Sequence, residues 1–339
     1  MGIRVAMITG SYPPDACGVG DYTARLVSCL REAGLEVEVF SDFNWGVTGF
    51  ARLARAIHRF QPDIVHVQYP TVGYGKGLLP QLLSIVIAPC VVTLHEASQV
   101  HWLRRLSLYP FALRARRIVM TSEFERDYVA KAAPWIRRRL QVIRIGGFAV
   151  FSPAQHKDFP EVTYFGLIRP NKGVEAFLQV ARMAQQEGGK LSFRVIGQPD
   201  AKSMEYYHSL RAQAAGLPVE WVIGQDAPIV ADMLSRTRIA YLPFPDGASE
   251  RRSSLLAMLA AGVAVVTTRG RHTPADMDHA VCFVTSAEEA VHQLSWLNAD
   301  MQQREALVSG ALKYAESFSW DKIRYAHKSL YEQLVGLNK

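Results

Sequence analysis

The sequence predicts an α/β protein made of two domains, each with a doubly wound parallel sheet. Its 339 residues, 49% of them hydrophobic and 20% charged, exceed the size at which a single core keeps growing. Short β-branched runs alternate with segments of helical period from the first residue, which is typical of parallel βαβ units. Residues 151–160 lack periodicity and separate two such series. We therefore expect domains at 1–155 and 156–317 and a terminal segment at 318–339.

The first series contains six short apolar runs that read as strands. Its clearest helix spans Gly20 to Ala33, where Tyr22, Leu26 and Leu30 recur at helical spacing before Gly34. A second helix covers 50–57. The charge-free stretch 77–94 contains two prolines and a β-branched tail, so we expect a short helix and a buried strand rather than a membrane span. The predicted strands are 3–8, 36–40, 64–68, 91–94, 118–121 and 141–143.

The second series repeats this pattern and ends in two helices within 301–337, which meet at Phe318-Ser-Trp320. In two doubly wound sheets, the ligand is expected at the carboxyl ends of the strands, in a cleft between the sheets. The predicted strands are 162–165, 192–196, 219–223, 239–243, 264–267 and 281–284. The predicted helices are 173–186, 227–236, 251–261 and 287–298.

The cysteines and the charge restrict the setting of the protein. Four scattered cysteines without CxxC spacing, and an amino terminus unlike a secretory leader, favour a cytoplasmic location. The whole net charge of +7 lies in the first 150 residues, and eleven basic side chains but only three acidic ones fall within 101–145. Such a local surplus argues against a nucleic-acid-binding protein. Aromatic residues among these arginines fit either an anionic lipid surface or a solvated amphipathic helix.

Two features of the first half suggest a binding edge. The connection Thr9 to Asp21 carries three glycines and opens a helix, a geometry that offers amide groups to an anion, although a ligand-free loop fits equally well. His95 follows a buried strand, where a side chain enters the cleft; a packed histidine is the alternative. His66 lies within a strand, and there packing is favoured.

The second half places cations at two strand ends. Arg169 and Lys172 lie three residues apart after a strand, where both can reach one diphosphate or remain solvated. Arg251 and Arg252 begin a predicted helix that Ser249 or Ser253 can cap. At a helix start each arginine costs about 0.3 to 1 kcal/mol unless an anion is bound, which favours a phosphate site.

An acidic segment near the end of the chain resembles a metal motif only superficially. Asp276-Met-Asp278-His279 has no partner ligand at suitable spacing, so a solvated turn is favoured and no metal is expected.

Together these residues resemble the retaining glycosyltransferases of the GT-B fold, specifically glycosyltransferase family 4. The segment Gly166-Leu-Ile-Arg169-Pro-Asn-Lys172-Gly173 is similar to the family's Gly-x-Leu-x-x-x-Lys-Gly pattern, and Ala257 to Val266 to its Glu-Ala-Met-Ala-x-Gly-x-Pro-Val-Val. Four further segments also correspond to parts of the family's sequences: the loop through Gly18 and Gly20, the strand at 62–67, Thr93 to Glu96, and Phe318-Ser-Trp320. One departure concerns two family glutamates, for the donor sugar and the ribose, which here read Ser249 and Ala257, with Glu250 one position off register.

The resemblance implies metal-independent, retaining transfer of a sugar from a nucleoside-diphosphate sugar to an acceptor hydroxyl, with no cofactor. A terminal helix returning to the first domain is also implied. A non-catalytic GT-B protein that binds a nucleotide or a protein partner is the alternative. The first domain is expected to carry the acceptor, anionic or membrane-associated through residues 101–145, at the inner face of the membrane. The implied catalytic residues are His95, Arg169 and Lys172; the implied donor-binding residues are Gly18, Val19, Gly20, Gly197, Ser249, Glu250, Arg251, Arg252, Ser253 and Ser254.

Overall fold

The structure is a computed structural model, and the chain in it divides into two compact units. Unit 1 comprises Met1–Gly146 and Trp320–Lys339, and unit 2 comprises Gly147–Ser319. The predicted linker at 151–160 and the predicted boundary after residue 155 lie outside the described residues. The structure describes residues 2–15, 17–75, 77–87, 89–95, 97–99, 107–146, 162–188, 191–199 and 201–336.

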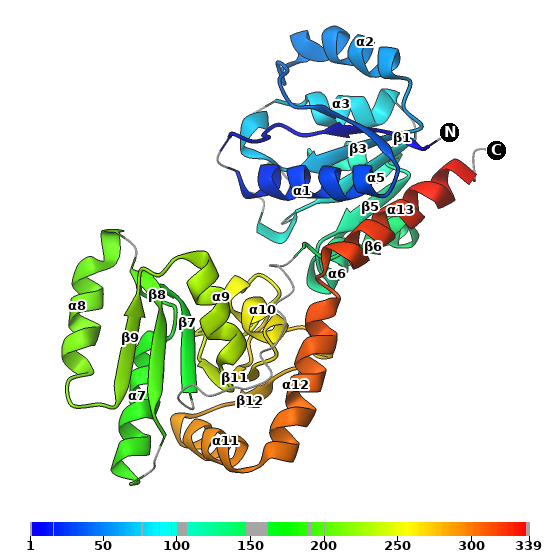
Figure 1. Cartoon of the computed structure of the whole chain (residues 1–339). Coiled ribbons are helices and arrows are strands. Elements are labelled where there is room, and N and C mark those ends of the chain that lie inside the picture. Colours follow the sequence, from blue (N-terminus) through cyan, green and yellow to red (C-terminus); the bar gives the residue numbers. More distant parts are fainter. Residues whose placement is uncertain are drawn as a thin grey trace. The chain divides into compact units, whose positions relative to one another are not determined.

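Each unit is built on a six-stranded sheet whose paired strands are parallel, which confirms the predicted α/β class (Figure 1). In unit 1 the strand order is β2-β1-β3-β4-β5-β6. The strands are β1 Arg4–Ile8, β2 Glu36–Phe40, β3 Ile64–Tyr69, β4 Cys90–Leu94, β5 Arg117–Met120 and β6 Leu140–Val142. The helices are α1 Gly18–Glu32, α2 Phe50–Phe60, α3 Leu79–Val86, α5 Tyr109–Arg114, α6 Glu123–Ala132 and α13 Trp320–Gly336.

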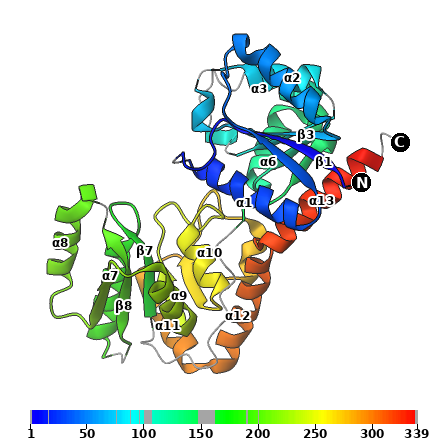
Figure 2. The ribbon, with the colours of Figure 1, turned by 45° about the horizontal axis from the view of Figure 1, so that its top comes forward.

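The alternation of side chains along the strands of unit 1 builds two separate cores. Ala6, Ile8 and Val65 face a core closed by α2, α3 and α5, whereas Val5 and Met7 face a core closed by α1 and α13. Helices α1 and α13, which are remote in sequence, lie side by side on this second face (Figure 2). The last helix therefore completes the first unit.

Unit 2 begins with its central strand, and its strand order is β12-β11-β10-β7-β8-β9. The chain builds one side of the sheet through β8 and β9 and then returns to place β10 on the other side of β7. The strands are β7 Val162–Ile168, β8 Phe193–Pro199, β9 Val219–Ile223, β10 Ile239–Leu242, β11 Ala264–Thr268 and β12 Cys282–Val284. The helices are α7 Val174–Gln186, α8 Met204–Gln213, α9 Ala227–Arg236, α10 Ser253–Ala260, α11 Ala287–Ala299 and α12 Met301–Glu316.

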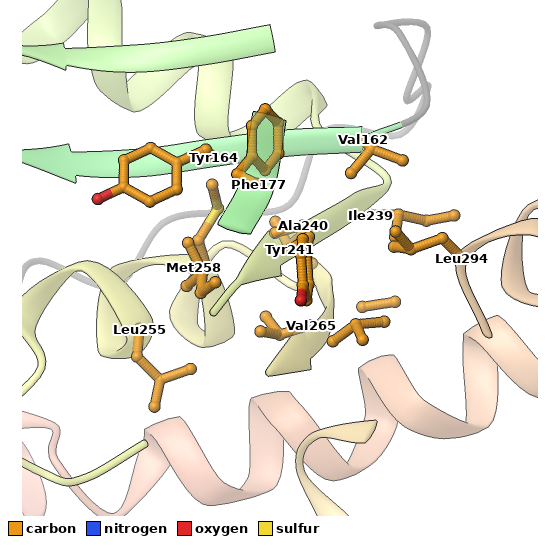
Figure 3. Packing of buried hydrophobic residues seen from close by; sticks show 14 of the residues in the cluster. Val162, Tyr164, Phe177, Ile239, Ala240, Tyr241, Leu255, Met258, Val265 and Leu294 are labelled. Atoms are coloured by element: carbon orange, nitrogen blue, oxygen red, sulfur yellow. The ribbon is translucent and has the colours of Figure 1, made fainter. Parts of the chain in front are cut away.

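The core of unit 2 is apolar and fills the space between its sheet and helices. Phe177 of α7 packs against Tyr164 of β7 and Tyr241 of β10, with ring centroids 5.7 and 6.3 Å apart (Figure 3). Met258 and Leu255 of α10 are completely buried in the same core. Burial of this face fixes α10, and with it the loop that precedes α10.

The stretch 77–94 folds as α3 followed by the fully buried strand β4, as predicted. No helix among the described residues is long and apolar enough to cross a bilayer.

Candidate functional site

The strand order of each sheet reverses at one point, where a doubly wound sheet usually binds its ligand. In unit 2 this point lies between β7 and β10, which pair in parallel. In unit 1 it lies between β1 and β3. The loops after these four strands therefore form the candidate site in each unit, and they hold most of the predicted site residues.

The loop between β7 and α7 is held in shape by a buried tyrosine. The Tyr164 hydroxyl donates to the carbonyl oxygen of Lys172 at 3.0 Å. Gly173 is the N-cap of α7 with φ of +86°, and a Cβ there would lie 2.0 Å from the Pro243 oxygen of the neighbouring loop. Only glycine fits this contact. The two loops at the reversal point are therefore locked together.

Three cations meet at this edge of unit 2. Burial lowers the pKa of Lys172, and the charges of Arg252 and Arg169 lower it further. Burial also lowers the pKa of Arg252, and the charge of Arg169 lowers it further. The structure therefore brings Arg169, Lys172 and Arg252 close enough to repel one another, and an anion would relieve this repulsion.

Arg252 is held in place from two sides. Its guanidinium donates to the Asp246 carboxylate and lies over the Phe244 ring, 4.7 Å from the centroid. Its side chain is only 13% exposed. One carboxylate beside three cations leaves a net positive charge, which suits a phosphate ligand.

The predicted start of α10 is wrong by two residues. Helix α10 begins at Ser253 with Arg252 as its N-cap, and no side chain caps it, whereas we expected a helix from 251 capped by Ser249 or Ser253. The backbone N–H of Arg252 donates to the Ser249 carbonyl instead, at 3.0 Å, and forms a turn. The uncapped first-turn amides of α10 thus remain available to an anion.

The other predicted residues of this turn lie at different depths. Arg251 and Ser253 are exposed, whereas Ser249 and Ser254 are half-buried. The Glu250 carboxylate accepts a 3.5 Å hydrogen bond from Tyr314 of α12. Ala257, where the family has its ribose glutamate, is buried in the core.

Gly197 lies opposite Gly166 where β8 pairs with β7. A Cβ at Gly197 would lie 2.1 Å from the Gly166 oxygen. Close approach of these two strands at the site edge therefore requires glycine at 197.

In unit 1 the predicted glycine loop leads into α1. Gly18, Val19 and Gly20 form the first turn of α1, and Cys17 is its N-cap. Burial raises the pKa of the Cys17 thiol, but backbone N–H groups of Val72, Gly20 and Val19 outweigh this effect and lower it overall. The start of α1 is therefore electropositive.

His95 follows β4 directly and is buried, with 4% of its surface exposed. Its Nε2 lies 2.8 Å from Gln68 Oε1, and its ring meets Tyr22 of α1 edge-on at 5.3 Å. Burial, followed by the effect of His327, lowers the pKa of His95 to about 3. His95 is thus neutral at physiological pH and lies beside α1. His66 is packed inside unit 1 as expected, and both ring nitrogens have partners.

Four residues of these sites were missed by the sequence analysis: Cys17, Gln68, Tyr164 and Asp246. A cysteine before a helix and an aspartate before an arginine-rich turn are weak signals that could have indicated two of them. Nothing in the sequence pairs Gln68 with His95 or Tyr164 with residue 172, because the first contact depends on strand register and the second on the path of the loop after β7.

The acidic segment 276–279 forms a short 3-10 helix in which Asp278 is paired with Arg269. Within the described ranges, no three His, Cys, Asp or Glu side chains are grouped to hold a metal ion.

The basic region of unit 1 folds around α5 and the 3-10 helix Pro134–Arg139, called η4. Arg139 of η4 donates to the carbonyl groups of Ala112, Leu113 and Ala115 at the end of α5, so the two elements share one surface. We call this surface the α5–η4 face. Exposed residues of α5, of the turn after it and of η4 include Tyr109, Leu113, Arg114, Arg116, Trp135, Arg137 and Arg138. Arg104 and Arg105 of the predicted basic region lie outside the described residues.

Two family models match the sequence, one in each half. Residues 40–146 match Glycosyltransferase Family 4, and residues 159–300 match Glycosyl transferases group 1. Among curated proteins no sequence matches the chain significantly.

Solved structures of low sequence identity share the fold over nearly the whole chain. A glycosyltransferase from Rickettsia africae superposes with a TM-score of 0.72 at 12% identity, covering 98% of this chain and 99% of that one. Anabaena Alr3699/HepE in complex with UDP and glucose superposes with a TM-score of 0.62 at 14% identity, covering 98% of this chain and 100% of that one. Sucrose-phosphate synthase from Thermosynechococcus elongatus superposes with a TM-score of 0.63 at 16% identity, covering 99% of this chain and 100% of that one.

Proposed function

The chain is a family 4-like glycosyltransferase of the GT-B fold, and on that basis we propose that it transfers a sugar from a nucleoside-diphosphate sugar to an acceptor hydroxyl. We further propose that the transfer retains the anomeric configuration and uses no metal. The observation that carries the proposal is the group of Arg169, Lys172 and Arg252 at the reversal point of unit 2.

The chemistry requires stabilisation of a leaving diphosphate. The bond from the anomeric carbon to the diphosphate oxygen breaks, and a bond to the acceptor oxygen forms on the same face of the sugar. The acceptor proton passes to the released diphosphate. Negative charge therefore grows on the diphosphate, where Arg169, Lys172 and the first-turn amides of α10 would stabilise it.

The turn before α10 is assigned to the rest of the donor. Ser249 and Ser253, with Arg251 and Ser254, would bind phosphate oxygens by charge and hydroxyl groups. Since Ala257 offers no carboxylate, the ribose would be held by backbone groups. In unit 1, Gly18, Val19 and Gly20 would offer the amides of α1, and His95 would hydrogen-bond the transferred sugar. Anabaena Alr3699/HepE, with UDP and glucose bound, supports this class of donor.

The acceptor is proposed to lie at an anionic lipid surface that the α5–η4 face contacts. Tyr109, Leu113 and Trp135 are 51, 65 and 59% exposed, and arginines stand among them. Aromatic and cationic side chains on one face are typical of proteins that bind at membrane interfaces. The protein would then work in the cytoplasm, at the inner face of the membrane.

A donor screen tests the proposed function. Unfolding temperature is measured with UDP-, GDP-, ADP- and dTDP-sugars, because a ligand that binds only the folded state raises it. We expect one nucleotide class to stabilise the protein and to be cleaved slowly with release of its diphosphate, unchanged by EDTA. Binding without cleavage, with or without an acceptor, would instead favour a non-catalytic protein.

A further inference from the structure

A row of polar side chains interrupts the apolar core between the sheet of unit 1 and helices α1 and α13. His66 and Gln68 follow Ile64 at intervals of two along β3, so all three point to the same face of the sheet. Thr93 of β4 joins them, and His66, Gln68 and Thr93 are 0, 0 and 1% exposed. Since buried polar groups require partners, each contact in this row restricts where hydrogens can lie.

The orientation of the Gln68 amide is set by Met7. The Gln68 amide nitrogen lies 3.4 Å from the Met7 sulfur, which can only accept a hydrogen bond. The NH2 group must therefore face Met7 and also lies 3.4 Å from His66 Nε2. The Gln68 carbonyl oxygen is consequently the atom that faces His95.

This orientation fixes the hydrogen on His95. A carbonyl oxygen accepts only, so at 2.8 Å His95 Nε2 must carry the hydrogen and donate it to Gln68 Oε1. The Nδ1 atom of a neutral imidazole then holds a lone pair. No described residue forms a hydrogen bond with His95 Nδ1.

Helix α13 anchors the far end of the row. His66 Nε2 accepts a hydrogen bond from the Gln68 amide and lies 2.7 Å from the Thr93 hydroxyl. Since a neutral imidazole has one acceptor and one donor nitrogen, His66 Nδ1 donates to the Tyr331 hydroxyl at 2.6 Å. Among the described residues, the titratable groups around His95 are Tyr22 of α1, His66 of β3 and His327 of α13. Burial lowers the pKa of His66 and of His327, so all three histidines are neutral at neutral pH.

We propose that Gln68 is a positioning and specificity-determining residue that holds His95 in its Nε2–H form, so that Nδ1 accepts a hydrogen bond from a hydroxyl of the transferred sugar. This inference rests on the proposed function for its substrate. Because Nδ1 of His95 can then only accept, it favours a sugar that presents a hydroxyl at this position and repels one that presents a carboxylate there. The selectivity for the sugar would thus arise because Gln68, buried in the sheet, determines which nitrogen of His95 carries the hydrogen.

Nitrogen NMR of the full chain tests the inference without any ligand. In protein labelled with [15N]histidine, the His95 signals are assigned by their loss in His95→Asn. We expect a protonated Nε2 and an unprotonated Nδ1 at pH 7. A protonated Nδ1 would overturn the inference, and this measurement needs no variant of Gln68 to fold.

Kinetics supply the second readout. The substrate is whichever sugar nucleotide of the UDP, GDP, ADP and dTDP panel the protein cleaves. Gln68→Leu should lower kcat/KM about tenfold in the parent protein. In a His95→Ala background it should cause no further loss, because Gln68 acts through His95. Gln333→Leu, an exposed glutamine of α13, is the control and should change nothing. Additive losses would contradict the inference. If no sugar nucleotide is cleaved, the proposed function fails while the NMR result still decides the state of His95.

Discussion

Single residues determine the shape of the loops at the reversal point of unit 2. Tyr164 ties the loop after β7 through its bond to the Lys172 carbonyl, and the glycine at 173 lets the loop after β10 approach. The sequence indicated Arg169, Lys172 and Gly173 as candidates, because their spacing follows a recognisable pattern. It could not indicate Tyr164, because the role of this residue depends on where the fold places its buried hydroxyl group.

The two left-handed glycines at the ends of α7 allow a matched test of this close contact. Gly173→Ala places a Cβ 2.0 Å from the Pro243 oxygen, whereas Gly188→Ala, with φ of +73°, has nothing within 4 Å. We expect Gly188→Ala to lose about 1 kcal/mol from its backbone conformation alone. Gly173→Ala should lose clearly more, because the loops must move apart. Urea unfolding measures both, and equal losses would contradict the packing described here.

At the scale of elements, the sequence predicted most helices and strands because their hydrophobic periods are strong. It placed the start of α10 at 251, because a serine before an apolar run usually caps a helix. In the structure Arg252 takes the N-cap position, held by Asp246 and Phe244. Tertiary contacts of one arginine thus decide the boundary, and these contacts are not visible in a local pattern.

Helix α13 brings a buried histidine to the sheet of unit 1, and this makes stability depend on pH. His327 Nδ1 donates to the Ile323 carbonyl, while its buried Nε2 forms no hydrogen bond with any residue that the structure describes. Burial lowers the pKa of His327 to about 4, below its ordinary 6.5. The unfolded chain therefore binds a proton that the folded chain excludes, so this contribution to stability is lost as the pH falls from about 6.5 toward 4.

We expect His327→Leu to remove this loss. The free energy of unfolding of the variant, relative to the parent, should rise by about 2 kcal/mol between pH 8 and pH 5. Urea unfolding at both pH values gives the difference. His292→Leu, at an exposed histidine of α11, is the control and should show little change. A relative stability that is the same at both pH values would show that His327 is not a buried neutral group.

At the level of the whole molecule, the net charge of +7 is distributed unevenly along the chain. All of it lies in the first 150 residues, whereas Arg169, Lys172 and Arg252 lie in a charge-balanced half. Composition could therefore indicate the basic surface, but only the fold showed that Arg139 joins α5 and η4 into one face. The identity of the sugar depends on a few contacts that neither composition nor fold class determines.

Vesicle binding tests the α5–η4 face. The protein should sediment with anionic vesicles at low salt and be released as salt rises, because screening weakens the attraction. The double variant Arg137→Ala/Arg138→Ala should bind about thirtyfold more weakly, at about 1 kcal/mol for each lost cation. Arg55→Ala/Arg59→Ala on α2 removes the same charge elsewhere as the control. Absence of binding at low salt, or equal weakening in both variants, would favour a soluble anionic acceptor.

Arg169, Lys172 and the first-turn amides of α10 are proposed to stabilise the leaving diphosphate of a sugar nucleotide, and the turnover of Lys172→Ala measures this effect. Diphosphate release is measured with the donor selected in the screen, alongside Lys313→Ala, an exposed lysine of α12, as the control. We predict that Lys172→Ala lowers kcat by about 100- to 1000-fold without lowering the unfolding temperature, since it removes a repelled charge. Lys313→Ala should match the parent. A turnover of Lys172→Ala close to that of the parent would contradict the account.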